Sequence, residues 1–494
     1  MLETMAQPAL KLRPSTGLFQ WLKVVILFGG SLVIAGVLLF GNLSRESVGF
    51  LTVLLMLFLM LSGVHIGLAM VGAGLLGLFA LGGWTAATST LAQSVYDPTA
   101  TWQLSVIPTF ILMGTALWKS GLTQRAFEAA KVWLGNVPGG LALTTTVAGA
   151  GLAASSGSTI ALAHALGRVA VPEMLRAQYR PGFAIGATAM AGTLGQIIPP
   201  SVLLVVYAGA AQTSVGTQLM AGIVPGLLLA AAFCLYIFCV AVFKPSIAPR
   251  MGESFPLGVK VRALLGVVPL AVVAIIVVGG IASGLFTPTE SAAVGAVVAI
   301  LLGWSIRPNE PKTLRAFGRY FLDVVSISAM SSAGIFLLLI GVHALTRVVT
   351  LSRIANGLTD RIVGLGLSAS AFLLVLVVLY LLLGMFMDTM AIILLTVPIL
   401  AAPLNELGVD MVWFGVFMVV MVEIGMVTPP MGILSFVLHR IVQDPEVNQG
   451  KAISLTSVFA GAMPFVLVAL GFAILLIYVP DIVTWLPGQL ATTE

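Results

Sequence analysis

Residues 195–201 read GQIIPPS, and residues 425–431 read GMVTPPM. Both stretches lie inside long apolar runs, where a proline removes a backbone hydrogen bond and clashes with the preceding helical turn, at a cost of about 3 kcal/mol or more. In hydrocarbon the freed carbonyl finds no water, so such a break persists only where it lines a polar cavity or is buried in protein. The two stretches therefore predict two broken helices. In each, the glycine four residues before the first proline lets the backbone open and another segment approach.

The composition places both breaks in a membrane protein. Of the 494 residues, 59% are hydrophobic and 8% are charged, and the mean hydropathy is +1.11. A spanning helix needs about 20 mostly apolar residues. The runs that meet or approach this length are 22–42, 49–82, 219–243, 263–285, 366–383 and 455–478. We therefore expect an all-α polytopic membrane protein of roughly a dozen spans or half-spans.

The N-terminal region contains one ordinary apolar run and one that is too long for a single span. Residues 1–20 are polar, and the apolar run that follows them has no clear small-residue cleavage site, so an uncleaved first span is predicted. The run at 49–82 would measure about 48 Å as one helix, against about 30 Å for the hydrocarbon core. It is therefore either tilted or broken, with Ser62 and Gly63 as the expected break.

The charged and polar residues argue against several functions. The net charge of +5 comes from basic residues in short loops between apolar runs, as the positive-inside rule expects, so nucleic-acid binding is not predicted. The four histidines form no HExxH pattern and no lysine lies in a GxxxxGK[ST] loop, which argues against a metalloprotease and an ATP-driven pump. Cys234 and Cys239 share one apolar run and are interpreted as packing residues. No enzyme is predicted.

The basic loops give the two breaks opposite directions across the membrane. The loops 244–262 and 305–319 each carry four basic residues and are predicted to be cytoplasmic. Three arginines precede the first break, which then runs outward, whereas Arg440 and Lys451 follow the second break, which then runs inward. Two similar broken elements that cross in opposite directions are typical of an inverted-topology repeat.

A second pair of segments supports the repeat. Residues 155–172 and 382–398 lie upstream of the two breaks, and each begins with small and polar residues and continues as an apolar run to a proline. The offset between Pro172 and Pro398 is 226, whereas the offset between the breaks is 230. We therefore expect the two halves to differ by a four-residue insertion or deletion.

Polar residues in these segments are the candidate binding groups. A carboxylate at mid-membrane depth costs on the order of 3 kcal/mol, so Asp388 in GMFMDTMA is expected to face a cavity, a cation or a partner. Residues 155–159, SSGST, occupy the equivalent place in the first half. Hydroxyls and freed carbonyls suit a weakly bound sodium ion, and the amide ends of helices suit an anion. Glu423 is either a coupling carboxylate or the partner of a buried basic group such as Arg168.

Each of these features has a structural alternative. The proline pairs could be plain kinks that neighbouring helices stabilise, and the serine cluster could serve close helix packing through small residues. Asp388 could be an interfacial residue near a loop. Two proline pairs with matched glycines in opposed halves favour the functional interpretation, because a structural kink has no reason to recur in that pattern.

Four stretches resemble the large membrane subunit of the TRAP (tripartite ATP-independent periplasmic) transporters. They are GQIIPPSVLLVVYAG at 195–209, FTPTESAAVGA at 286–296, GMFMDTMAIILLTVPIL at 384–400 and VWFGVFMVVMVEIGMVTPPMGILSFV at 412–437. The resemblance covers about residues 49–480, and four motifs in the right order make it specific.

The resemblance implies a secondary transporter that imports an organic anion, such as a C4-dicarboxylate or a sugar acid, on a sodium gradient. The anion would come from a periplasmic solute-binding protein, and a separate small four-helix membrane subunit would be the partner in the bacterial inner membrane. In the family, two re-entrant hairpins and two broken helices enclose the site, on an elevator-type transport domain that moves against a scaffold. A non-transporting membrane anchor and a passive channel remain alternatives.

The expected organisation has four parts. Residues 1–48 would hold a cytoplasmic segment and an additional transmembrane helix, and 263–308 a connecting helix pair. Residues 49–262 would be the first repeat, with a hairpin near 150–172 and a broken helix at 195–201, and 309–494 the second, with a hairpin near 382–398 and a broken helix at 425–432. By motif match, the solute-binding residues would be Ser158, Pro200, Ser201, Thr389, Pro430 and Gly432. The sodium-binding residues would be Ser156, Gly157, Gly195, Gly384, Asp388, Gly425 and Thr428.

Overall fold

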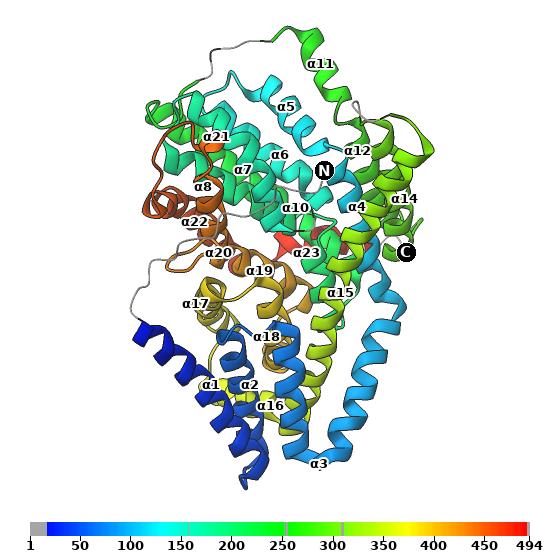
Figure 1. Ribbon diagram of the computed structural model, residues 1–494, viewed down its shortest axis with the longest axis vertical. Helices are drawn as coiled ribbons and strands as arrows, with labels where there is room; N and C mark the ends of the chain where they lie inside the picture. The colour runs from blue at the N-terminus through cyan, green and yellow to red at the C-terminus, as the bar shows by residue number, and fades with distance from the viewer. Residues whose placement is uncertain (1–16, 157, 251, 253–254, 308–310, 492–494) are drawn as a thin grey trace.

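The structure, a computed structural model, describes residues 17–491 except for 157, 251, 253–254 and 308–310 (Figure 1). Every regular element within these residues is a helix, which confirms the predicted all-α class. In this part of the chain, seven helices are long and apolar enough to span a membrane, and a pair bent by 48° makes an eighth if it counts as one span. Shorter apolar helices of 10–17 residues supply the expected half-spans.

The N-terminal block begins the helical arrangement. It consists of α1 (Gly17–Phe40), α2 (Arg45–Leu61), α3 (Ile66–Ala100), the 3-10 turn η1 (Trp102–Ser105), α4 (Val106–Lys119) and α5 (Leu122–Leu134). The long run at 49–82 is broken, because α2 ends at Leu61 and Gly63 has a φ of +89°. Glycine adopts this left-handed conformation without steric cost. The second of the two alternatives, a break at Ser62 and Gly63, is therefore confirmed.

The first set of central helices contains a hairpin and a broken helix. Its elements are α6 (Gly140–Ser156), α7 (Thr159–Arg176), α8 (Pro181–Thr193), the 3-10 turn η2 (Leu194–Gln196), α9 (Val202–Ala211) and α10 (Val215–Phe243). Helices α6 and α7 pack against each other as the hairpin, and α8 and α9 are separated by the first proline pair. The helix break predicted from GQIIPPS is therefore confirmed.

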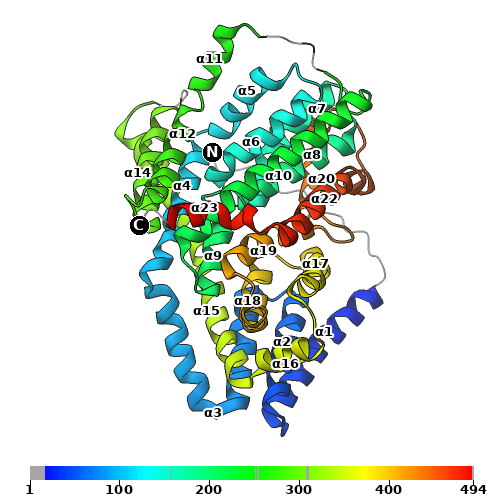
Figure 2. The same ribbon diagram turned by 180° about the vertical axis from the view of Figure 1, so that it is seen from behind.

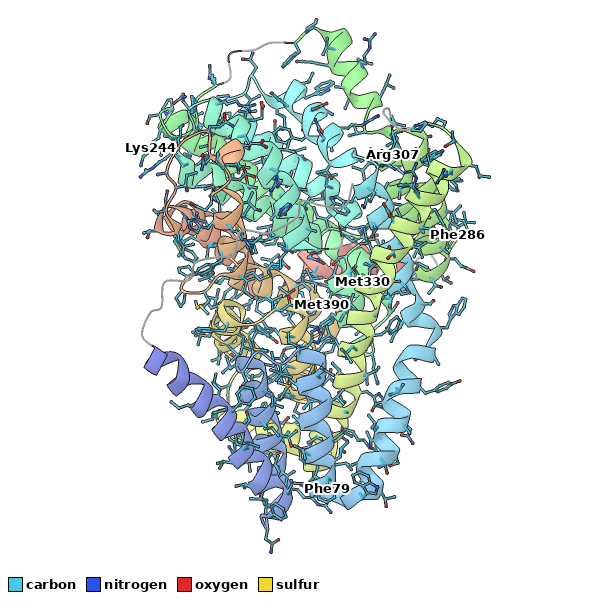
Figure 3. All side chains as sticks on the ribbon, in the orientation of Figure 1. Phe79, Lys244, Phe286, Arg307, Met330 and Met390 are labelled. Atoms are coloured by element: carbon cyan, nitrogen blue, oxygen red, sulfur yellow. The ribbon has the colours of Figure 1, made fainter. Side chains whose placement is uncertain are left out.

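Peripheral helices connect the two central sets. They are α11 (Leu257–Leu265), α12 (Val268–Ala274), the π-helical segment η3 (Ile275–Gly279), α13 (Gly280–Ala282), α14 (Pro288–Ser305), α15 (Leu314–Ser352) and α16 (Ile354–Gly364). The long α15 packs along α3 and α4, and α14 packs along α4. Figure 3 shows Lys244 and Arg307, which begin the two basic loops, toward the same end of the molecule.

The second set of central helices repeats the order of the first. Its elements are α17 (Ala369–Phe386), α18 (Thr389–Glu406), α19 (Met411–Gly425), α20 (Ile433–Ile441), α21 (Pro445–Asn448), α22 (Leu455–Tyr478) and α23 (Asp481–Ala491). Helices α17 and α18 form the second hairpin, and the second proline pair separates α19 from α20. Helix α23, which has no counterpart in the first set, lies across α10 (Figure 2).

From the hairpin tip to the start of the broken helix, the two sets keep a constant sequence offset. Helices α7 and α18 have 18 residues each and begin at Thr159 and Thr389, an offset of 230 that equals the offset between the breaks. The four-residue difference expected from Pro172 and Pro398 is therefore wrong. Both prolines lie inside their helices rather than at a shared end, so they do not mark equivalent positions.

The contacts between the two sets are reciprocal. Helix α7 of the first set packs against α20 of the second, and α18 of the second packs against α9 of the first. In the same way α8 packs against α22, and α19 packs against α10. Matching elements of the two sets thus exchange partners.

The helices that lead into the breaks form the centre of the protein. Every residue of α8 from Gly182 to Thr193 is buried, and so is every residue of α19 from Trp413 to Gly425. A helix that is apolar and buried on all sides lies inside a bundle rather than at its surface. Both breaks therefore begin in the protein interior, where other helices can satisfy the interrupted backbone.

Candidate functional site

At the first break, a serine side chain forms hydrogen bonds with the interrupted backbone. Ser201 begins α9 as its N-cap, where its Oγ accepts a hydrogen bond from the Leu204 amide at 3.2 Å and donates one to the Gln196 carbonyl. The peptide bond before Pro200 is cis, and Pro200 and Gly195 are both buried. One hydroxyl thus bonds a carbonyl before the prolines and an amide after them.

The second break uses two hydroxyls in a similar way. Thr428 Oγ1 donates to the Ile424 carbonyl at 2.8 Å, and Ser435 Oγ donates to the Val427 carbonyl at 3.0 Å. Both side chains are buried. A carbonyl oxygen has two lone pairs, so these groups can still serve a cation. Two carbonyls of the break thus already accept hydrogen bonds from hydroxyls of the protein.

The end of the second break is fixed by a glycine. Gly432 precedes α20 with a φ of +37°, and a Cβ at this position would lie 2.9 Å from the Phe459 ring and 3.0 Å from the Thr428 carbonyl oxygen. A side chain would meet both obstacles, so glycine is required here. Pro430, preceded by a cis peptide bond, is exposed. This break is thus less enclosed than the first.

The tip of the first hairpin lies between α6 and α7. Ser158 is the N-cap of α7, and its Oγ accepts from the Ala161 amide at 3.4 Å. Gly157 lies outside the described residues, and Ser156 is described only as the last residue of α6. The predicted tip is therefore confirmed in position, while the sodium-binding roles of Ser156 and Gly157 stay a prediction.

The tip of the second hairpin is equivalent to the first. Asp388 is the N-cap of α18, and its Oδ1 accepts from the Met390 amide at 3.0 Å. Thr389 follows as the first helical residue and is buried. Ser158 and Thr159 hold the same positions at the start of α7, so the equivalence predicted from the sequence is confirmed. The second tip differs in placing a carboxylate at its cap.

Two glycines bring the second hairpin against the second break. A Cβ on Gly384 of α17 would lie 2.6 Å from the Cα of Gly425 in α19, and a Cβ on Gly425 would lie 2.6 Å from the Cα of Gly384. The two backbones are therefore in direct contact. In the first half, a Cβ on Gly149 of α6 would lie 3.0 Å from the Cβ of Ala191 in α8. The prediction that glycine lets another segment approach is confirmed for Gly425.

A buried carboxylate joins the two halves. Glu423 in α19 is 1% exposed, and its Oε2 accepts a hydrogen bond of 2.8 Å from Thr159 Oγ1 in α7. Its Oε1 has no hydrogen-bond partner among the described residues. Arg168 pairs instead with Asp444, at 3.6 Å, so the alternative in which it neutralises Glu423 is wrong. A buried carboxylate of this kind needs a cation, a proton or water at its second oxygen.

A cavity of about 460 Å³ lies at the hairpin tips. It is lined by Phe110, Ile111, Gly114, Thr115 and Trp118 of α4, Thr123 of α5, Ser158, Ala161, Leu162 and Ala165 of α7, Val202 of α9, Ile327, Ser331 and Ile335 of α15, and Met390 of α18. The N-termini of α7, α9 and α18 all reach it, at Ser158, Val202 and Met390. The positive ends of the three helix dipoles favour an anion at this end of the cavity. The caps Ser158, Ser201 and Asp388 already accept one first-turn amide each. Figure 3 shows Met390 near the middle of the molecule.

The cavity gathers only part of the predicted site. Ser158 lines it directly, whereas Ser201 and Thr389 are each next to a lining residue. Asp388 lines a different cavity, of about 460 Å³, with apolar residues of α2, α3 and α17. The other predicted residues, Pro200, Gly195, Gly384, Gly425, Thr428, Pro430 and Gly432, line neither cavity. The walls from α4 and α15 were missed, because apolar residues on apolar helices give no signal in the sequence.

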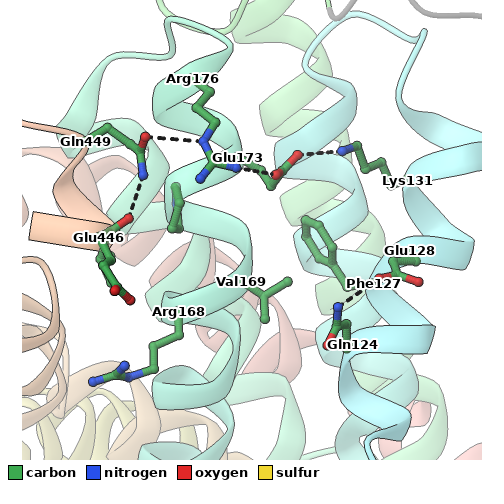
Figure 4. A pocket seen from close by; sticks show the side chains of 12 residues that line it. Gln124, Phe127, Glu128, Lys131, Arg168, Val169, Glu173, Arg176, Glu446 and Gln449 are labelled. Atoms are coloured by element: carbon green, nitrogen blue, oxygen red, sulfur yellow. Dashed lines mark hydrogen bonds and ion pairs between the residues drawn. The ribbon is translucent and has the colours of Figure 1, made fainter. Parts of the chain in front are cut away.

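A second polar pocket lies at the far end of the first hairpin (Figure 4). It has a volume of about 530 Å³ and lies between α5, α7 and the segment around α21. Glu173 of α7 accepts from Lys131 of α5 at 2.5 Å and from Arg176 at 3.0 Å, and Arg176 also donates to Gln449. These ion pairs are partly exposed and contribute about 0–1 kcal/mol each. None of the predicted site residues lines this pocket.

Comparisons with known proteins agree with this arrangement. Residues 53–482 match the family described as "Tripartite ATP-independent periplasmic transporter, DctM component". "C4-dicarboxylate TRAP transporter large permease protein DctM" of Pseudomonas aeruginosa is 36% identical over 407 residues, which are 81% of this chain and 90% of that protein. "Sialic acid TRAP transporter large permease protein SiaM" of Vibrio cholerae is 32% identical over 359 residues, which are 72% of this chain and 81% of that protein.

A solved structure supports the fold. The YdaH transporter of Alcanivorax borkumensis has a TM-score of 0.58 at 16% identity, over 80% of this chain and 88% of that chain, a likeness that concerns the fold alone. Paired hairpins and interrupted helices in a multi-pass protein thus define a helical membrane transport protein. The chain belongs to the family of the tripartite ATP-independent periplasmic transporter DctM component, the large permease subunits of the inner membrane. The predicted family is confirmed.

Proposed function

We propose that this permease imports a small organic anion, a carboxylate, which a periplasmic solute-binding protein delivers and a sodium gradient drives. The observation that carries the proposal is the convergence of three helix N-termini, those of α7, α9 and α18, on one cavity between the hairpin tips. Aligned peptide dipoles at these ends favour a negative charge. The relatives named for C4-dicarboxylate and sialic acid are consistent with an anionic solute.

The sodium ion is proposed to bind beside this cavity rather than in it. Asp388 at the second hairpin tip is half-buried, and Glu423 beside the second break is buried. Glu423 keeps one oxygen without a hydrogen-bond partner among the described residues. Hydroxyl and main-chain oxygens lie close by at Thr159 and Thr428. Such oxygen ligands suit sodium, and its charge would stabilise the carboxylates. The predicted set of Ser156, Gly157, Gly195, Gly384, Asp388, Gly425 and Thr428 is retained as the proposal, with Glu423 added.

The conformational change that accompanies transport is proposed to follow the division of the chain into two inverted repeats. The offset of 230 from the hairpin tip to the broken helix and the reciprocal packing of the two central sets support an inverted repeat. Its halves would be residues 49–262 and 309–494, with 263–308 between them. Helices α4 and α15 supply the fixed wall of the cavity, so we assign them to the scaffold and the two hairpins with their broken helices to an elevator-type transport domain. Residues 1–48 add a further helix, and a separate small four-helix subunit is the proposed partner.

Uptake into proteoliposomes tests the proposal. Vesicles would contain this chain and its small subunit, and the external solution would contain the substrate-loaded binding protein, with either a sodium gradient or choline in place of sodium. Uptake is expected only with sodium. Asp388→Asn is expected to abolish uptake without loss of insertion, and so is the double variant Pro199→Ala with Pro200→Ala. Conductance without alternating access would instead indicate a channel, and full tolerance of these variants a non-transporting anchor.

A further inference from the structure

A further cavity, of about 660 Å³, follows the cavity at the hairpin tips along the same helices. On α15 the cavity at the hairpin tips reaches Ile335, and the further cavity begins at Leu339, about one helical turn later. On α9 the lining moves from Val202 at its start to Ala208 near its end, and η1, which leads into α4, contributes Leu104. The two cavities are therefore consecutive along three shared stretches of chain.

This further cavity lies toward the side opposite the basic loops. Helix α15 begins at Leu314 in the basic stretch 305–319, lines the cavity at the hairpin tips from Ile327, and lines the further cavity from Leu339 to Thr350 near its other end. Its 39 residues measure about 58 Å as a straight helix, against about 30 Å for the hydrocarbon core. With the basic loops in the cytoplasm, as the sequence predicts, this cavity lies on the outer side, and we call it the outer cavity.

One face of α15 is polar where it lines the outer cavity. His343, Thr346, Arg347 and Thr350 have the spacing i, i+3, i+4 and i+7, which places them on one side of the helix, and all four line the cavity. The four residues that complete this segment are apolar and buried, namely Ala344, Leu345, Val348 and Val349. An ionisable residue in an apolar helix of a membrane protein generally faces a polar cavity or a partner. The pattern therefore directs the polar side chains at the outer cavity.

The connection from α9 to α10 gives the outer cavity a second polar wall, with Gln212, Thr213 and Ser214. Ser214 Oγ accepts from the Thr217 amide at 3.3 Å, which leaves its own proton to donate. Thr213 Oγ1 is buried and has no hydrogen-bond partner among the described residues. Buried hydroxyls are normally hydrogen-bonded, so this group has bonding capacity for a ligand in the cavity.

The charge of the outer cavity is positive. Arg347 is exposed and forms no ion pair or hydrogen bond with the described residues, and no aspartate, glutamate or lysine is among the described residues that line the cavity. The C-terminus of α9 and the N-terminus of α10 both reach the cavity, so their dipoles offset each other and Arg347 sets the sign. A free guanidinium binds a carboxylate through two parallel hydrogen bonds.

We propose that the outer cavity is a second anion site, in which Arg347 binds the carboxylate of the arriving solute before the solute reaches the hairpin tips. His343, Thr213 and Ser214 supply further hydrogen bonds. The volume is sufficient for a small organic anion, and a positive charge at the entrance raises the local concentration of anions. This inference rests on the proposed function and adds a binding site to the route of its substrate.

Cysteine reactivity measures the charge of the outer cavity without requiring transport. Thr346→Cys, made together with Cys234→Ala and Cys239→Ala, would be reconstituted with the small subunit in phosphatidylcholine vesicles. Its reaction rates would be compared for an anionic methanethiosulfonate, the sulfonatoethyl reagent, and a cationic one, the trimethylammonioethyl reagent. Adding Arg347→Gln is expected to lower the ratio of the anionic to the cationic rate at least about fivefold, because it removes the one fixed charge among the described lining residues.

Arg353→Gln is the matched control for this measurement. It removes the same charge from the end of α15, but Arg353 does not line the outer cavity and lies two helical turns, about 10 Å, beyond Thr346. At about 0.15 M salt this distance exceeds the screening length. The control is therefore expected to change the ratio of rates less than about twofold. A ratio that falls equally in both variants contradicts the assignment to Arg347.

Protection of the same cysteine tests whether an anion occupies the site. Succinate and N-acetylneuraminate serve as probes, with ionic strength held constant by chloride. Each is expected to slow the reaction of the Thr346→Cys protein, and Arg347→Gln is expected to raise the half-protecting concentration at least about tenfold. A lipid phosphate has similar oxyanion chemistry, so the measurement would be repeated in phosphatidylglycerol vesicles. Protection there without either probe would assign Arg347 to a lipid headgroup and overturn the inference.

The outcomes separate the outer site from the proposed function. No protection by either probe, with Arg347 present and the protein folded, overturns the outer site, while sodium-driven uptake would still support the proposed function. Protection without any sodium-driven uptake supports an anion site at Arg347 and overturns the proposed function. Should the Arg347→Gln variant not fold, protection of the Thr346→Cys protein by the two probes in phosphatidylcholine decides the inference.

Discussion

Replacing Gly425 by alanine tests whether the contact between the second break and the second hairpin is required. The added Cβ would lie 2.6 Å from the Gly384 Cα, 3.1 Å from its carbonyl carbon and 3.2 Å from the Tyr380 oxygen, whereas ordinary contact begins near 3.4 Å. All three obstacles are backbone atoms of α17, so no side-chain rotation relieves them. Helix α17 must move away from α19 by about 0.8 Å.

The expected cost follows from this displacement. Overpacking in a well-packed interior costs about 1–3 kcal/mol, and backbone obstacles between buried helices place this site in the upper half of that range. Alanine recovers up to about 1 kcal/mol relative to glycine in a helix. A net loss of about 1–2 kcal/mol remains. Because α17 carries the tip at Asp388, and misplacement of a functional group by about 1 Å can reduce a rate about 100-fold, uptake is expected to fall at least about tenfold.

Uptake and thermal unfolding should be measured on the same preparations. Gly471→Ala in α22 is the matched control, because a Cβ there meets nothing within 4 Å and only the helical gain applies. The control is expected to keep its uptake and a normal or slightly raised midpoint. If Gly425→Ala behaved like this control in both measurements, the two backbones could not be in the contact described, and the role assigned to this glycine pair would be wrong.

Other substitutions follow from hydrogen bonds of the same region. Glu423→Gln keeps the shape of the side chain and its bond to Thr159 but removes the charge. We expect a smaller rise in the thermal unfolding midpoint when sodium replaces choline. An undiminished rise would rule out a role of Glu423 in ion binding. Thr159→Val leaves the Glu423 carboxylate without its hydrogen-bond donor and should lower the free energy of unfolding by about 1–3 kcal/mol. Thr159→Ser should restore most of this stability. A valine variant as stable as the unaltered protein would contradict the hydrogen bond. Ser201→Ala removes the N-cap of α9 at the first break and should lower the free energy of unfolding by about 1–2 kcal/mol. This loss should exceed that of Ser454→Ala, which removes the N-cap of α22. The reverse order would show that the Ser201 hydroxyl does not stabilise the break.

Local backbone chemistry explains which parts of the fold were predictable. The breaks at 197–201 and 426–432 follow from proline pairs, whose effect on a helix depends on the residue itself and little on its surroundings. The same holds for Gly63, where the chain turns through a left-handed conformation between α2 and α3. The equivalence of the hairpin tips was also predictable, since Ser158 and Asp388 are both residues that cap helices well.

Features that depend on packing could not be predicted in the same way. Pro172 and Pro398 suggested unequal halves, because a proline was taken as the end of an apolar run. In the protein both lie inside helices of equal length, which continue past them. The cavity wall from Phe110 and Ile335 carried no sequence signal at all, because every helix of such a protein offers similar residues and only the tertiary fold decides which of them face a ligand.

The candidate site is divided between the two halves in a way that links them. Helices α7 and α9 of the first half and α18 of the second bring their N-termini to one cavity, and Glu423 of the second half is bonded to Thr159 of the first. Neither half therefore has a complete site by itself. Under the proposed function, a cation at Glu423 would change the charge beside the start of α7, and an anion in the cavity would lie at that same helix end. Opposite charges held at one helix terminus favour each other. The bond between Glu423 and Thr159 would then be a direct physical route by which binding of one proposed ion strengthens binding of the other.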